Sequence, residues 1–193
     1  QAADGRRDGQ ESRGLGEVYK GQADYNDILG AKEAQFIAAR DSFYMATVSE
    51  TGWPYVQHRG GPAGFVKILD EKTVGFSDFR GNRQYVSVGN ASENDRVSLF
   101  FMDYPSKTRL KLLGRMRVVD PSEQDLLKNL ETESSYRAHA ERGLMISIEA
   151  FDWNCLQHIT PRYTRAEVVH EVLSLKAKAN ELEAELERHQ TKD

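Results

Sequence analysis

The chain has 193 residues, enough for one domain that buries a substantial core without disulfides or metals. Its 26 basic and 30 acidic residues give a net charge of −4, which offers no basic field for a nucleic-acid backbone. One cysteine excludes an intrachain disulfide framework, and no apolar run approaches the roughly 20 residues that span a bilayer. These features favour a soluble cytoplasmic protein that binds neither nucleic acid nor membranes.

Three segments differ in composition. Residues 1–23 carry five glycines among mixed charges and are expected to form a flexible N-terminal arm. Residues 24–164 are expected to form the folded domain. Residues 165–193 form an amphipathic helical pattern.

The expected domain begins with a helix over about 24–40, with Ile28, Leu29, Phe36 and Ile37 on its apolar side. Short β-rich runs follow, separated by turn residues, and two helices are expected near 82–90 and 121–131. The fold class is therefore a β-rich α+β protein with an antiparallel barrel or sandwich. The expected strands cover residues 43–48, 53–59, 65–69, 73–77, 96–103, 108–119 and 144–153.

The C-terminal segment carries a stripe of residues spaced alternately four and three apart, which is a heptad pattern. The stripe either packs back on the domain or forms a coiled coil between two chains. No glycine or proline after Pro161 would fold it back, so the coiled coil is favoured. The stripe comprises Val168, Val172, Leu175, Ala179, Leu182, Leu186 and His189.

Two stretches could bind an anion. In HRGGPAG (58–64), Arg59 stands before two glycines, whose backbone can approach a ligand closely. In FSDFRGNRQ (76–84), Asn82 and Arg83 follow Gly81 at the expected start of a helix, where a phosphate binds well. Taken alone, each stretch is more often a hairpin turn with a solvated arginine than an anion site.

The run KTRLKLLGRMR places five cations on one face of a strand and apolar residues, from Leu110 to Val118, on the other. A solvated outer face is the commoner explanation of such a stripe, but like charges on one strand repel unless an anionic group lies over them. The cations are Lys107, Arg109, Lys111, Arg115 and Arg117.

Other site patterns are weak. The five histidines lack metal-ligand spacing, so no metal site is expected. Cys155 has His158 three residues later, but a lone cysteine after a strand is more often a packed residue than a nucleophile.

The order of these motifs over about residues 30–165 resembles the pyridoxamine 5′-phosphate oxidase-related, FMN-binding proteins. The resemblance implies a split β-barrel, and a homodimer that builds FMN sites across its interface. It also implies which residues bind the cofactor. In the family, a segment that corresponds to residues 59–67 and a triplet that corresponds to 82–84 contact the FMN phosphate. Two strand residues at 77 and 78, an arginine on a later strand and a tryptophan near the end of the domain are then expected to lie close to the flavin. The residues implied in this way are Arg59, Pro62, Lys67, Ser77, Asp78, Asn82, Arg83, Gln84, Arg109, Trp153 and Asn154.

Two departures bear on the substrate. Gln84 stands where the family has a lysine, so Arg109 or Lys107 is expected to supply the missing charge. The Arg-x-His pattern that holds pyridoxal phosphate is replaced by QHITPR (157–162), which argues against pyridoxamine phosphate as substrate.

The favoured hypothesis is therefore a dimeric FMN-dependent oxidoreductase acting on an unidentified small molecule, with no catalytic side chain assigned. The alternatives are a reductase that uses a deazaflavin or nicotinamide, a non-enzymatic flavin- or haem-binding module, and a dimeric adaptor with an empty barrel. The haem alternative would need an axial ligand such as His58 or His158.

Overall fold

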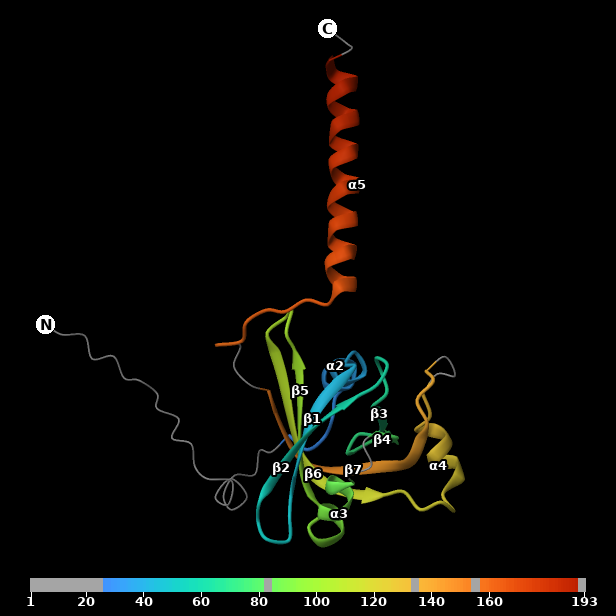
Figure 1. The fold of residues 1–193 in the computed structure, drawn as a ribbon. Coiled ribbons are helices and arrows are strands. Elements are labelled where there is room, and N and C mark those ends of the chain that lie inside the picture. Colours follow the sequence, from blue (N-terminus) through green and yellow to red (C-terminus); the bar gives the residue numbers. More distant parts are fainter. Residues whose placement is uncertain (1–25, 82–84, 133–135, 154–156, 191–193) are drawn as a thin grey trace, which may run out of the picture.

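The computed structural model describes residues 26–81, 85–132, 136–153 and 157–190, with side chains up to residue 185. Seven antiparallel strands form one sheet in the order β2-β1-β5-β6-β7-β4-β3 (Figure 1). The β-rich α+β class expected from the sequence is confirmed. The strands are β1 (Ser42–Val48), β2 (Pro54–Gly60), β3 (Lys67–Asp70), β4 (Thr73–Phe79), β5 (Arg96–Asp103), β6 (Thr108–Val118) and β7 (Ala140–Trp153).

The first described helix, α2 (Ala31–Ala38), is shorter than the helix expected over 24–40. Residues 24 and 25 lie outside the described residues. The backbone N–H of Leu29 donates to the carbonyl of Glu71 at 2.7 Å, so this residue is tied to the β3–β4 turn and precedes the start of α2. Ile28, expected on the apolar side, is exposed. The capping bond from the Gly30 N–H to the Glu33 carboxylate, 3.0 Å, sets the start of α2.

The two inner helices also begin later than expected. Helix α3 covers Val86–Glu93, and α4 covers Gln124–Asn129. Before α4, Glu123 accepts a hydrogen bond from the Asp120 N–H at 2.9 Å and pairs with Arg117. Pro121 and Ser122 therefore belong to a turn around Asp120 and not to the helix.

The core lies where the sheet folds over on itself. Phe43 of β1 packs edge-on against Phe76 of β4 at 5.2 Å, although the two strands are far apart in the sheet order. Phe43 also stacks on Phe65, from the loop between β2 and β3, at 5.8 Å. This curvature brings the end of edge strand β2 close to β4.

The C-terminal helix α5 (Arg165–Gln190) projects away from the sheet (Figure 1). Every side chain described in it, from Arg165 to Glu185, is exposed. The described part of the apolar stripe, from Val168 to Leu182, is therefore not packed on the sheet of its own chain. No helix in the described part of the chain is long and apolar enough to cross a membrane.

Candidate functional site

Arg59, at the end of β2, forms a largely buried ion pair with Asp78 of β4. The two side chains are only 13% and 7% exposed. Arg142 of β7 lies opposite Asp78 in the strand register, and its Nε is 3.5 Å from the other carboxylate oxygen. The Arg59 Nε is buried and has no hydrogen-bond partner among the described residues. An unsatisfied buried donor of this kind is costly unless something accepts from it.

Two further charges surround this pair. Glu141 accepts from Arg80 Nε at 3.0 Å and lies 3.6 Å from Arg142. The hydrogen bond from Arg80 holds the pKa of Glu141 below its ordinary value, so its carboxylate is charged at neutral pH. Three arginines thus face two carboxylates, which leaves one positive charge in excess. The arginine cluster is defined as Arg59, Asp78, Arg80, Glu141 and Arg142.

Tyr85 connects the arginine cluster to the predicted phosphate triplet. Its hydroxyl donates to Glu141 at 3.3 Å, and the Arg142 guanidinium lies 4.6 Å from its ring. The predicted residues Asn82, Arg83 and Gln84 lie outside the described residues. The described residues on either side of them, Arg80 and Tyr85, both contact Glu141.

Ser77 lies on the other face of β4 from Asp78, because adjacent strand residues alternate. Its buried hydroxyl donates to the carbonyl of Leu130 at 2.9 Å, directly after α4. The strand register pairs Lys67 with Gly75, so Lys67 shares this face with Ser77. The structure therefore separates the predicted residues Ser77 and Lys67 from Arg59 and Asp78.

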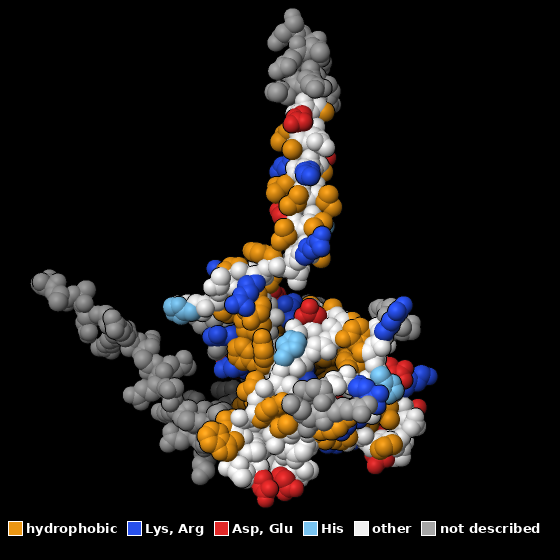
Figure 2. All heavy atoms as spheres, in the orientation of Figure 1, with side chains coloured by type: hydrophobic (Ala, Val, Ile, Leu, Met, Phe, Trp, Pro, Cys, Tyr) orange, Lys and Arg blue, Asp and Glu red, His pale blue; other side chains and the backbone are white. Residues whose placement is uncertain are grey.

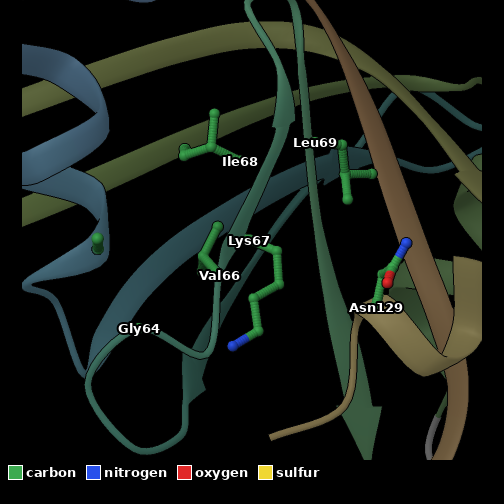
Figure 3. Close-up of a pocket in the computed structure, with 7 residues that line it drawn as sticks. Gly64, Val66, Lys67, Ile68, Leu69 and Asn129 are labelled. Atoms are coloured by element: carbon green, nitrogen blue, oxygen red, sulfur yellow. The ribbon is translucent and has the colours of Figure 1, made fainter. Parts of the chain in front are cut away.

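Lys67 lines a shallow cavity of about 420 Å³ between the Gly64 loop and α4 (Figure 3). In this view its side chain extends beside that loop, and Asn129 of α4 lies beyond Leu69. Of the predicted cofactor residues that the structure describes, no other one lines this cavity.

The glycines of HRGGPAG serve internal packing. A Cβ at Gly61 would lie 2.6 Å from the ring of Phe65, so only glycine allows this core side chain its place. Pro62 accepts from the Phe65 N–H at 2.9 Å and closes the same turn. The expected close approach at Gly61 is thus made by the protein's own phenylalanine.

The cations of β6 also have neighbours in their own chain. Lys111 pairs with Asp152 at 3.1 Å, Arg115 with Asp95 at 2.8 Å, and Arg117 with Glu123 at 2.7 Å. Carboxylates of the same chain therefore balance these three cations, which need no external anion.

The ends of this strand differ from expectation as well. Lys107, counted in the stripe, lies in the preceding turn with a positive φ of 55°. Val118, expected in the core, is exposed, and the following Val119 is buried.

Arg109 lies elsewhere on β6, with its guanidinium 6.0 Å from the ring of Phe100. Together with Tyr104, His158 and Arg162 it lines a hollow of about 340 Å³. None of the residues that line this hollow belongs to the arginine cluster.

Trp153, at the end of β7, is held by α2. Its indole N–H donates to Glu33 at 2.7 Å, and its ring packs edge-on against Phe36 at 4.8 Å. Burial alone would raise the pKa of Glu33, but the hydrogen bonds from Trp153 and from the backbone N–H groups of Glu33 and Gly30 outweigh it and lower this pKa. Asn154 and Cys155 lie outside the described residues.

Arg142, Glu141 and Glu33 were not singled out from the sequence. Arg142 and Glu141 precede the strand expected to begin at Leu144, and the observed β7 begins four residues earlier, at Ala140. Had the strand predicted over 144–153 been extended to residue 140 and paired with residues 76–79, Arg142 would have been placed opposite Asp78. Glu33 had a local signal, because a carboxylate three residues into a helix commonly caps its start.

The comparisons with known proteins agree with this fold. The family model described as pyridoxamine 5′-phosphate oxidase matches residues 29–155. No curated protein matches the chain. Among solved structures, a variant of HupZ from Group A Streptococcus has a TM-score of 0.50 at 13% identity and covers 66% of this chain and 100% of its own.

Two further structures are more distant. A protein from Clostridium acetobutylicum, related to general stress protein 26 of the pyridoxinephosphate oxidase family, has a TM-score of 0.46 at 15% identity, covering 67% of this chain and 88% of its own. An FMN-binding protein from Syntrophomonas wolfei has a TM-score of 0.47 at 12% identity, covering 63% and 83%. Since the family model spans most of the folded part of the chain, the chain belongs to the pyridoxamine 5′-phosphate oxidase family.

Proposed function

We propose that this chain is an FMN-binding flavoprotein, that two copies hold the flavin between them, and that it acts as an oxidoreductase on a small molecule. The observation that carries the cofactor assignment is the buried Nε of Arg59, which has no hydrogen-bond partner in the described part of the arginine cluster's surroundings. A phosphate would accept from this donor and neutralise the excess positive charge. Membership of the family supports the same assignment.

The residues that would hold the phosphate come from three segments. Arg59 and Arg142 are already close together around Asp78. Arg83 follows Arg80 in the chain and would add the third arginine. Asp78 holds Arg59 and Arg142 by ion pairs, and Glu141 also contacts Arg142, so two of the arginines that a phosphate would need are already side by side.

Bound FMN would supply hydride or electron transfer, and the protein would supply binding and orientation. Ser77 has no place in this proposal, since its hydroxyl is committed to the Leu130 carbonyl on the opposite face of β4. The sequence QHITPR at 157–162 continues to argue against pyridoxamine phosphate as substrate.

The test compares FMN with riboflavin, which lacks the phosphate. Purified protein is titrated with each ligand, and flavin fluorescence follows binding for the natural chain and Arg83→Ala. Loss of a charge-assisted contact should weaken FMN binding by about 2–3 kcal/mol and leave riboflavin binding nearly unchanged. Arg115→Ala is the matched control, because Arg115 is exposed and paired on β6.

Three outcomes would contradict the proposal. If Arg83→Ala weakened the binding of FMN and riboflavin equally, Arg83 would not contact the phosphate. A copurifying pigment with a Soret band would indicate haem. Failure of the natural chain to take up added FMN would exclude FMN as the cofactor.

A further inference from the structure

Helix α5 begins at a well-defined cap. Thr164 and Glu167 exchange hydrogen bonds: the Thr164 N–H donates to the Glu167 carboxylate at 2.6 Å, and the Glu167 N–H donates to the Thr164 hydroxyl at 3.2 Å. The hydrogen bond from the Thr164 backbone holds the pKa of Glu167 below its ordinary value, so the cap stays charged at neutral pH. The start of α5 is therefore fixed by local contacts.

Beyond this cap the helix exposes apolar side chains along its length (Figure 2). Val168, Val172, Leu175 and Leu182 are 49%, 44%, 58% and 57% exposed. A helix of 26 residues is about 39 Å long, and the apolar residues of the stripe, 168–186, cover about 27 Å of it and need a facing surface.

The stripe has the side-chain chemistry of a two-stranded coiled coil. The alternation of four and three places Val168, Leu175, Leu182 and His189 at d positions, and Val172, Ala179 and Leu186 at a positions. A β-branched residue at a with leucine at d favours two parallel strands. Ala179 at an a position allows the two helices to approach closely.

The charges beside the stripe fit a second copy of the same helix. In a parallel pair, a g residue lies beside the e residue five positions further along the partner helix. Glu171 at g then meets Lys176 at e, and Lys178 at g meets Glu183 at e. Both pairs are of opposite charge. Within one helix, residues five apart do not face each other, so this pattern does not serve the single helix.

We propose that α5 is a docking surface for α5 of a second copy, forming a parallel, in-register, two-stranded coiled coil. The inference is independent of the flavin site, because the family match ends at residue 155 and α5 begins at Arg165. The titration with FMN described above tests the flavin site, and the two experiments below test the pairing of α5.

The first experiment measures distances between spin labels on the full chain. In a Cys155→Ser background, single cysteines replace His170, Ala177 or Ala184, which occupy the same outward heptad position. A parallel pair gives one label–label distance at all three sites. In an antiparallel pair, moving the label by seven residues changes the axial separation by about 20 Å. A distance that varies with position, or unpaired labels at every site, would overturn the proposal.

The second experiment tests the register through charge. With the label at Ala177→Cys, Glu171→Lys places lysine beside Lys176 of the second copy and should broaden or abolish the distance. The double variant Glu171→Lys/Lys176→Glu restores opposite charges and should restore the distance. Glu181→Lys, the same charge change away from the stripe, is the control and should leave it unchanged. If Glu171→Lys has no effect, or the double variant fails to recover, the proposed register is wrong.

Discussion

The arginine cluster and the β6 stripe are both rich in cations, but their surroundings differ. Arg115 and Arg117 lie at the surface of β6, roughly half exposed, and each pairs with carboxylates from its own chain. Arg59 is mostly buried, and beyond its ion pair with Asp78 no described residue accepts a hydrogen bond from its Nε. Water can complete the hydrogen bonds of the surface arginines but has little access to the buried one.

This contrast shows why counting cations along a strand is a poor guide to an anion site. The stripe has more positive charges in sequence than the cluster, yet its carboxylate partners leave it no need of an anion. The cluster draws its charges from β2, β4, β7 and Arg80 directly after β4, and one of its donors has no acceptor among the described residues. Burial and an unsatisfied donor therefore point to a ligand more strongly than the number of charges.

Arg59→Ala should have the largest effect on folding. It removes the main partner of Asp78, which is 7% exposed, and leaves that carboxylate with Arg142 alone. Removing one partner of a buried pair typically costs about 3–5 kcal/mol, and the remaining arginine places this variant near the lower limit. Urea denaturation of the protein without flavin measures the free energy of unfolding.

The double variant Arg59→Ala/Asp78→Ala provides the control. Because it removes the stranded carboxylate, its free energy of unfolding should fall by less than the sum of the two single changes. Additive losses would mean that the two side chains do not interact, and the contrast between buried and surface arginines would fail.

Glu33→Gln should cost about 1.5–3 kcal/mol of stability at neutral pH, because hydrogen bonds to a charged acceptor become neutral ones. The pKa of Glu33 is lowered from its ordinary value of 4.5, so its stabilisation is present above that pH and is lost as pH falls through the folded-state value. The difference in unfolding free energy between the natural chain and Glu33→Gln should therefore shrink below about pH 4.5. A difference that stays constant from pH 7 into the acid range would show that the charge of Glu33 is unimportant.

Ser77→Ala extends the comparison to neighbours on one strand. The change removes the donor to the buried Leu130 carbonyl and should cost about 1–2 kcal/mol in thermal or urea unfolding. FMN affinity should not change, since Ser77 faces α4 and Asp78 faces the arginine cluster. Reduced FMN affinity in a variant that remains folded would return Ser77 to the cofactor site.

The strands could be predicted well from the sequence, and the helix starts less well. Alternation of buried and exposed residues along 96–103 and 108–118 is a local pattern, so it predicts these strands almost to the residue. The start of α4 depends on the hydrogen bond between the Asp120 N–H and the Glu123 side chain, and the spacing of apolar residues does not predict such a contact. The start of α2 depends on Leu29 bonding to Glu71, which is distant in the sequence.

The same distinction holds for the candidate site. Arg59 and Asp78 were proposed through the family resemblance, and the structure brings them together. Arg142 joins them only because the register of β4 and β7 places it opposite Asp78, a relationship between residues 64 positions apart. The partners of Lys111, Arg115 and Arg117 are likewise set by tertiary contacts, which is why the stripe suggested an anion.

Arg117→Ala should have the smallest effect on stability. It tests the comparison from the side of the surface arginines on β6. The side chain is 46% exposed, and its two-pronged bond to Glu123 is at the surface. Surface pairs of this kind contribute about 0–1 kcal/mol, and salt screens them. Urea unfolding should therefore shift only slightly, and less in high salt than in low salt, while FMN affinity stays unchanged. A loss of stability as large as that of Arg59→Ala, or a loss of FMN affinity, would mean that the β6 stripe binds an anion after all and that burial does not separate the two sets of arginines.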